Sequence, residues 1–162
     1  IFKLNASKAK TTQSKLFKPK HKQFKLPSLK TTWVEDAYDQ MELLGFPLCN
    51  YFELINEILL DNIKAKDMDA YINKTVVIYG VLVNTRFHKG GNGKLMRFCT
   101  FTDREGEYFD TVHFSKVVDT YPISGIGVYA CCGKVIEEFD FCSIDILWTK
   151  KLPLLQDPRS LI

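Results

Sequence analysis

Residues able to carry out chemistry are present, but they are not spaced as a catalytic or metal site. The three histidines, five cysteines and nineteen carboxylates form no Ser-His-Asp set and show no metal-ligand spacing. The glycine-rich run from Lys89 to Lys94 lacks the following helix and the Lys-Ser/Thr pair of a phosphate-binding loop. Glu105, Glu107 and Asp110 flank a predicted turn and are interpreted as solubilising residues. The sequence therefore predicts no catalytic residue, no metal and no cofactor.

One segment combines strand-forming residues with positive charge. Between Asn84 and Thr102 there is no acidic residue, and the segment carries Arg86, His88, Lys89, Lys94 and Arg97. Such a cationic patch attracts phosphate groups. The alternative is a solvated hairpin whose lysines keep it soluble. Phe98 lies within this patch, and Tyr108 and Phe139 follow it, so these three aromatic rings are candidates for stacking on bases.

Charge is distributed unevenly along the chain. Residues 1–30 contain nine lysines and no carboxylate, while the remaining 13 basic and 19 acidic residues leave the rest at −6. Residues 31–74 set three lysines against nine acids, and residues 75–150 are near neutral with eight basic and nine acidic groups. These differences predict a flexible basic arm (1–30) followed by an acidic segment.

The acidic segment has the pattern of two or three short helices. Thr32 and Glu35 form a predicted capping box, after which apolar residues recur on one face until Gly45. A second helix is expected from Asn50 to about Asp61, with an apolar stripe that includes Phe52, Ile55 and Leu59. A short third turn is expected over 67–72. The predicted helical segment spans residues 31–73.

From Thr75 onward the hydrophobic period becomes that of strands. Strands are predicted over 76–86, 95–102, 107–114, 127–136 and 141–150, with a short helix over 115–121 between the third and fourth. Gly80 interrupts the first strand, which lets one bent strand serve both halves of a small barrel. Three strands, a helix and two strands is the element order of an OB-fold. We therefore expect a mainly β fold with a helical appendage. The expected architecture is a five-stranded OB-fold barrel (74–152) preceded by two or three short helices and a flexible N-terminal arm, and followed by a tail (153–162).

OB-folds bind single strands across strands two and three, between the loops joining strands one to two and four to five. Alternation divides strand two into two faces, and similarity to other OB domains implies that Phe98 faces the groove and that Cys99 and Phe101 face the core. The alternative is that the helical segment covers Phe98. The predicted nucleic-acid-binding residues are Arg86, His88, Lys89, Lys94, Arg97, Phe98, Tyr108 and Phe139.

The segments 36–48 (DAYDQMELLGFPL), 98–106 (FCTFTDREG) and 109–114 (FDTVHF) resemble the C-terminal region of the α (polymerase) subunit of bacterial DNA polymerase III. The resemblance covers roughly residues 10–155, and the helical segment ending in Leu-Gly-Phe-Pro-Leu is its most specific part. It implies an OB domain that contacts single-stranded template DNA. The nucleotidyl-transfer carboxylates of that DNA-directed DNA polymerase lie far upstream of this region. Expected partners are the rest of the α subunit and the replisome.

The basic arm contains the segment Gln13-Ser14-Lys15-Leu16-Phe17. It resembles the Q-x-x-L-F form of the peptide that binds the bacterial sliding clamp, and in the family such a motif precedes the OB domain. Gln13, Leu16 and Phe17 are the residues expected to contact the clamp. The alternative is that Leu16 and Phe17 are incidental apolar residues of a linker.

Two other functions fit the same fold. One is an OB domain that docks on a protein of the replisome and barely touches DNA, which the near-neutral barrel favours. The other is the anticodon-type OB domain of a tRNA synthetase. The apolar runs are too short to cross a bilayer, and the cysteines lack a C-x-x-C pair and are expected to be reduced. We therefore expect a cytoplasmic protein with no membrane partner.

Overall fold

The computed structural model describes residues 24–25, 30–57, 59, 63–91 and 93–161. Gln13, Leu16 and Phe17 lie outside the described residues, so their predicted contact with a clamp stays a prediction. The chain divides after Lys30 into two units. Every described helix and strand lies in the second unit, Thr31–Ile162.

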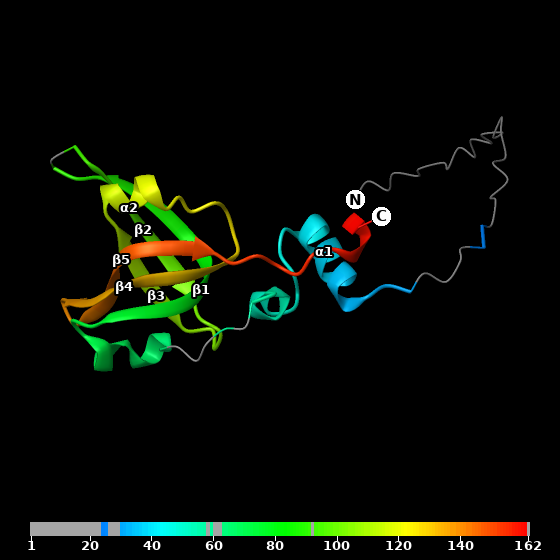
Figure 1. Cartoon of the computed structure of the whole chain (residues 1–162), viewed down its shortest axis with the longest axis horizontal. Coiled ribbons are helices and arrows are strands. Elements are labelled where there is room, and N and C mark those ends of the chain that lie inside the picture. Colours follow the sequence, from blue (N-terminus) through cyan, green and yellow to red (C-terminus); the bar gives the residue numbers. More distant parts are fainter. Residues whose placement is uncertain (1–23, 26–29, 58, 60–62, 92, 162) are drawn as a thin grey trace, which may run out of the picture. The chain divides into compact units, whose positions relative to one another are not determined.

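Five strands close into a barrel in the order β1-β2-β3-β5-β4 (Figure 1). They are β1 (Thr75–Lys89), β2 (Leu95–Thr102), β3 (Tyr108–His113), β4 (Val128–Glu138) and β5 (Phe141–Lys151). The helix α2 (Ser115–Thr120) joins β3 to β4. β3 and β5 run parallel, and the other neighbours run antiparallel. This is the connectivity of an OB-fold, so the predicted fold class is confirmed.

The long strand β1 belongs to both halves of the barrel. Residues 75–81 pair with β4 and residues 81–89 with β2, with a shift of register between Leu82 and Asn84. Gly80 lies where the core leaves no space for a side chain. A Cβ there would lie 2.7 Å from the Cβ of Phe101 and 2.7 Å from the ring of Phe109. The glycine that interrupts the apolar run is therefore required by close packing against β2 and β3.

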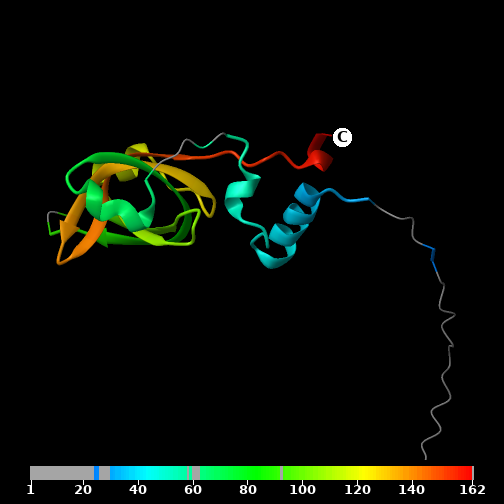
Figure 2. The ribbon, with the colours of Figure 1, turned by 90° about the horizontal axis from the view of Figure 1, so that it is seen from below.

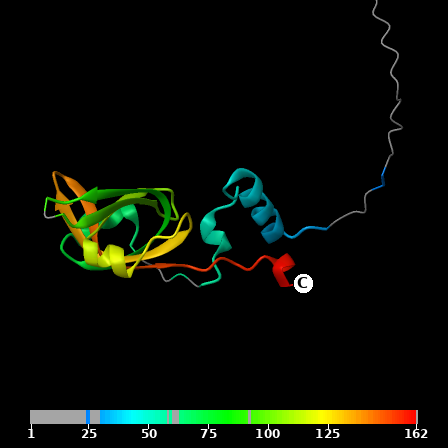
Figure 3. The same cartoon turned by 90° about the horizontal axis from the view of Figure 1, so that it is seen from above.

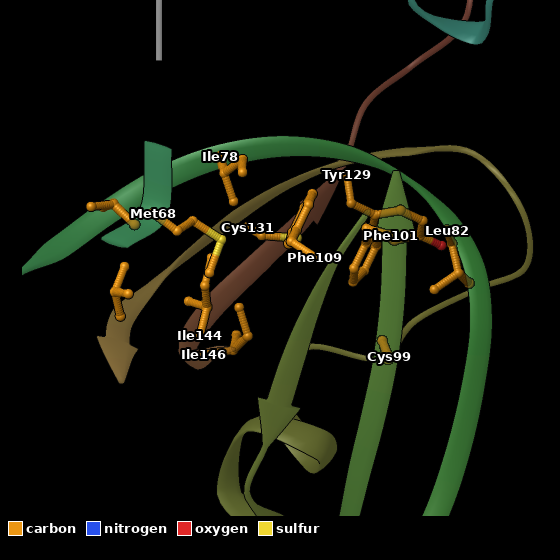
Figure 4. Packing of buried hydrophobic residues seen from close by; sticks show 12 residues of the cluster. Met68, Ile78, Leu82, Cys99, Phe101, Phe109, Tyr129, Cys131, Ile144 and Ile146 are labelled. Atoms are coloured by element: carbon orange, nitrogen blue, oxygen red, sulfur yellow. The ribbon is translucent and has the colours of Figure 1, made fainter. Parts of the chain in front are cut away.

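Aromatic rings fill the centre of the barrel (Figure 4). Phe101 stacks on Phe109 at 5.5 Å between centroids, and Tyr129 meets Phe101 edge-on at 5.9 Å. All three are almost completely buried. Burying a large apolar side chain contributes about 1.5–3 kcal/mol, so this cluster is a principal source of barrel stability.

Two helical elements cover opposite ends of the barrel. The 3-10 helix η2 (Ala65–Tyr71) contributes Met68 to the core, and α2 packs Val117 against it. In Figure 1 η2 lies below the strands and α2 above them. η2 is also tied to the β2–β3 turn, because Asp103 accepts a hydrogen bond from the Ala65 amide at 3.0 Å.

The first helix agrees closely with its prediction. α1 (Trp33–Leu44) begins at Thr32, whose side chain forms a capping box with Glu35, and ends at Gly45 with φ 85°. Its apolar stripe is only partly covered, since Ala37 is buried and Leu44 is exposed. The α1 helix is held to the C-terminal segment by the Tyr38 hydroxyl, which donates to the Leu155 carbonyl at 2.7 Å.

The predicted second helix over 50–61 is wrong. Asn50 caps a single 3-10 turn, η1 (Tyr51–Leu54), through the Phe52 amide at 3.1 Å, and the helix ends there. Ile55 instead forms a β-bridge with Leu154, and the Leu155 amide donates to the Leu54 carbonyl at 2.6 Å. Backbone groups that would continue the helix are thus used by a segment about 100 residues away in the chain.

The segment before the barrel packs on the barrel's outer surface, away from α2. Phe52 and Leu152 form a buried cluster with Val81, Val128 and Ala130. A third 3-10 helix, η3 (Pro158–Leu161), follows the barrel, and Arg159 pairs there with Asp39 at 2.6 Å. Among the helices of the described residues, none has the length and apolarity needed to span a bilayer.

Candidate nucleic-acid interface

A groove of about 600 Å³ lies on the outer face of the barrel, between the β1–β2 loop and the β4–β5 hairpin. These two connections lie on the same side of the barrel in all three views (Figure 1, Figure 2 and Figure 3). The groove is lined by Asn84, Arg86, His88, Phe98, Thr100, Asp110, Thr111, Val112, Glu138, Phe139, Phe141 and Ser143. None of these residues belongs to the described part of the helical segment. Phe98 is 41% exposed, so the described residues of segment 31–73 do not cover it.

Strand register arranges the groove residues in rows that run across the sheet. One row runs Asn84, Thr100, Asp110, Ser143 from β1 to β5. The next row runs Arg86, Phe98, Val112, Asp145. Side chains in a row share one face because strand residues alternate between faces.

Aromatic side chains stand at two edges of the groove. Phe98 of β2 is 41% exposed, and His88 packs against it edge-on with 6.5 Å between ring centroids. Phe139 and Phe141 of the β4–β5 hairpin are both exposed. Exposed rings on either side of a groove are the arrangement on which unpaired bases stack, each stack contributing about 1–3 kcal/mol.

Phe139 lies in a conformation that phenylalanine rarely adopts. Phe139 and Asp140 form the two-residue β4–β5 turn with φ of 55° and 60°. Positive φ at both positions is the geometry of a type I′ hairpin, in which Asn and Gly are preferred. A bulky residue there is an outlier. Phe139 is also fully exposed, so packing within the chain does not compensate for this backbone strain.

The two long sides of the groove differ in charge. β1 supplies Arg86 and His88, whereas Asp110 and Glu138 lie on the opposite side. The hydroxyl of Thr100 donates to Oδ1 of Asp110 at 2.6 Å. Burial, with Glu138 nearby, raises the pKa of Asp145, which lies in the adjacent row. The groove is therefore cationic along β1 and acidic along β3 and the end of β4.

Of the three carboxylates interpreted as solubilising, Glu107 is exposed, whereas Glu105 and Asp110 have more specific positions. Glu105 forms ion pairs with Lys64 and with Lys66, the latter at 2.8 Å. These bonds lower the pKa of Glu105 to about 2. Asp110 belongs to β3 and lines the groove.

The placement of Arg97 in a solvent-facing cationic patch is wrong. Its side chain is 3% exposed and lies on the face of β2 opposite to Phe98. Its guanidinium donates to the Tyr121 carbonyl at 3.0 Å and lies 3.4 Å from Nδ1 of His113. Arg97 therefore holds the end of α2 against the sheet. Strand alternation alone assigns Arg97 to the inner face of β2. The packing of α2 on β2 then buries the Arg97 side chain.

The other predicted residues are exposed but differ in position. Arg86, His88, Phe98 and Phe139 line the groove. Lys89 and Lys94 are exposed at the base of the β1–β2 loop, outside the lining residues, and Tyr108 is exposed at the start of β3, also outside it. Eight lining residues were not predicted from the sequence: Asn84, Thr100, Asp110, Thr111, Val112, Glu138, Phe141 and Ser143. Counting in twos from Arg86 and Phe98 finds Asn84 and Thr100, but the six on β3, β4 and β5 require knowledge of how these strands are arranged in the barrel.

Within the described ranges, no group of three or more His, Cys, Asp or Glu side chains is placed to hold a metal ion. His113 is buried, and burial together with the Arg97 charge lowers its pKa to about 3. Since the Arg97 guanidinium only donates, Nδ1 of His113 accepts and Nε2 carries the proton, which it shares with the Thr111 hydroxyl at 3.0 Å. This is a structural histidine.

No protein-family model and no curated protein matches the chain. Similar solved structures include the protein PriB of Ralstonia solanacearum, at 13% identity and a TM-score of 0.39, covering 48% of this chain and 95% of that one. The second OB-fold domain of replication protein A from Methanococcus maripaludis is 11% identical with a TM-score of 0.40, covering 59% and 97%. The N-terminal domain of PriB from Thermoanaerobacter tencongensis is 8% identical with a TM-score of 0.36, covering 51% and 97%. At these identities and TM-scores the likenesses do not bear on function.

Proposed function

We propose that this chain is a non-catalytic OB module that binds single-stranded nucleic acid in the groove between the β1–β2 loop and the β4–β5 hairpin. The observation that carries the proposal is the set of three exposed phenylalanines, Phe98, Phe139 and Phe141, around a groove that also presents Arg86 and His88. Rings offer sequence-tolerant stacking to unpaired bases, and the Arg86 guanidinium attracts the phosphate backbone.

The finer assignment comes from the sequence. The likeness to the α subunit of bacterial DNA polymerase III supports single-stranded template DNA as the ligand, with the catalytic carboxylates on another part of the polymerase. In this proposal Gln13, Leu16 and Phe17 attach the basic arm to the sliding clamp. The module then positions DNA, and another domain performs nucleotidyl transfer.

Titration of the full chain with labelled single strands and with duplexes of the same sequence tests the proposal. Phe98→Ala and Phe141→Ala are each expected to weaken single-strand binding by about 1–3 kcal/mol. Phe114→Ala is the matched control, because Phe114 is 47% exposed and lies outside the groove lining. Equal affinities for all three variants, or preference for the duplex, would refute the proposal. A strand of RNA in the same series separates a DNA module from the anticodon-type alternative.

A second candidate function is docking on a protein. Two observations favour it: the groove carries acids as well as cations, and Leu43, Leu44, Phe46 and Leu48 are exposed together at the end of α1. Protein docking predicts no single-strand affinity at the groove even at low ionic strength. The Phe98 titration therefore decides between the two candidates.

A further inference from the structure

The charge difference across the groove orients a bound strand. Arg86 and His88 lie on β1, while Asp110 and Glu138 lie on the other side. Phosphates are attracted to the first side and repelled by the second. A strand in the groove is therefore expected to have its backbone along β1 and its base edges toward β3 and β5, with Phe98 between the two sides.

Asp110 occupies the middle of the base-facing side. Strand register places it between Thr100 of β2 and Ser143 of β5. The Thr100 hydroxyl donates to Oδ1 at 2.6 Å, and Thr100 is the one hydrogen-bond partner of this side chain within the described part of the chain. An ionised carboxylate has about four acceptor positions, so one bond orients the group and leaves acceptors for a ligand.

A carboxylate discriminates between bases because it accepts hydrogen bonds and does not donate them. The exocyclic amino group of cytosine donates to Asp or Glu. Thymine presents the O4 carbonyl, an acceptor, in the corresponding position. Two acceptors facing each other repel, and the thymine carbonyl is left without a donor, which disfavours that base.

The neighbouring polar groups do not oppose this preference. The hydroxyls of Thr100 and Ser143 can donate or accept, so they tolerate either base. Asn84 is on the β1 side, and its side-chain carbonyl oxygen already accepts a hydrogen bond from the Thr85 backbone amide at 2.8 Å. Its remaining amide donors suit a phosphate oxygen on that side.

We propose that Asp110 is a specificity-determining residue that makes the groove select bases with an exocyclic amino group over thymine. This inference rests on the proposed function, since it needs a strand in the groove. It assigns Asp110, which the sequence had marked as solubilising, to direct recognition of a base edge.

The test measures the affinity of the full chain for oligodeoxycytidylate and oligothymidylate of equal length by fluorescence anisotropy. The lysines of residues 1–30 are expected to attract the phosphates of both strands alike, so they should favour neither strand. The wild-type chain is expected to bind the cytosine strand about tenfold more tightly. Asp110→Asn is expected to bring the ratio close to one, because an amide also donates to thymine O4.

Glu107→Gln is the matched control, because it removes one exposed negative charge outside the groove and is expected to leave the ratio unchanged. Asp110→Ser is measured beside Asp110→Asn, so that a variant that does not unfold cooperatively can be set aside. A wild-type ratio near one with binding that depends on Phe98 overturns the inference and leaves the proposed function intact. A preference for cytosine that persists in both Asp110 variants overturns the assignment to Asp110. Absence of binding to either strand overturns both.

Discussion

The guanidinium of Arg97 lies 3.4 Å from Nδ1 of His113, and both side chains are buried beneath α2. The pair joins β2 to β3 and, through the bond from Arg97 to the Tyr121 carbonyl, to the end of α2. A cation that the sequence offered for phosphate binding thus stabilises the fold. Protonation of His113 would set two positive charges side by side in the core.

Acid is therefore expected to destabilise the barrel through His113. Its pKa is lowered to about 3 in the folded chain, whereas an unfolded histidine has a pKa near 6.5. Between these values the unfolded chain binds one more proton than the folded chain, so stability falls by about 1.4 kcal/mol per pH unit as the pH drops below about 6.5. Urea unfolding is expected to show about 2 kcal/mol less stability at pH 5 than at pH 7.5.

The variant His113→Gln isolates that effect, because glutamine still offers an acceptor to Arg97 and does not titrate. Between pH 7.5 and pH 5 the variant is expected to lose much less stability than the wild-type chain, because most of the loss of about 2 kcal/mol comes from His113. The same pH dependence in the wild-type chain and the variant would show that another group is responsible.

Gly80→Ala is expected to destabilise the barrel by about 1–3 kcal/mol, because the new methyl group overpacks a filled core. Its Cβ would lie 2.7 Å from the Cβ of Phe101, which is fixed to the backbone of β2 and cannot rotate away. Thermal unfolding measures the effect. Gly91→Ala is the control, since no atom lies within 4 Å of a Cβ at that position, and equal melting temperatures for the two variants would contradict the packing argument.

Phe139→Asn is expected to stabilise the fold while weakening binding. Asparagine tolerates the left-handed conformation that Phe139 adopts at φ 55°, so relief of strain contributes about 1 kcal/mol. Loss of the ring removes about 1–3 kcal/mol of stacking with a base. Phe139→Leu separates the two effects, because leucine keeps the strain and lacks the ring. Undiminished single-strand affinity in both variants would exclude Phe139 from the interface.

The salt dependence of single-strand binding is expected to report on Arg86 and Lys89. Each phosphate contact contributes about −0.7 to the slope of log K against log salt, so Arg86→Ala and Lys89→Ala should each make the slope less steep by about that amount. Comparing variants of the full chain removes the contribution of the nine arm lysines.

Two controls should leave the slope unchanged. One is Lys116→Ala, on the exposed side of α2, and the other is replacement of the buried Arg97, if that variant folds. Slopes that are equal across the series would mean that these side chains do not contact phosphate.

The clamp motif predicts a modest separate interaction. Gln13, Leu16 and Phe17 are expected to bind a bacterial sliding clamp with micromolar affinity, about −8 kcal/mol. Titration calorimetry with the Leu16→Ala, Phe17→Ala double variant should show little or no binding, whereas Lys15→Ala should bind nearly as the wild type does. Equal affinity of the double variant and the wild type would reject the motif and leave the OB module unaffected.

Local patterns in the sequence determined most of the elements. Apolar alternation and the turn at Gly106 predicted β2 with its observed bounds and β3 to within one residue at each end, because strand period and turn chemistry depend on neighbouring residues. Thr32, Glu35 and Gly45 predicted both ends of α1 for the same reason. Arg86 and His88 on the β1 side of the groove were predicted from the segment between Asn84 and Thr102, which has basic residues and no acid.

Tertiary pairing decided the rest. The stripe after Asn50 has helical spacing, yet Ile55 pairs with Leu154 because a distant segment offers hydrogen bonds that a short helix does not match. Arg97 is buried because α2 covers the inner face of β2, and Asp110 joins the groove because β3 lies beside β5 in parallel. Neither neighbour can be read from local periodicity, since contacts across a closed barrel depend on the order in which its strands pair. The sequence by itself therefore determined most of the elements and the charges they carry, and only the tertiary structure decided which of those charges line the groove.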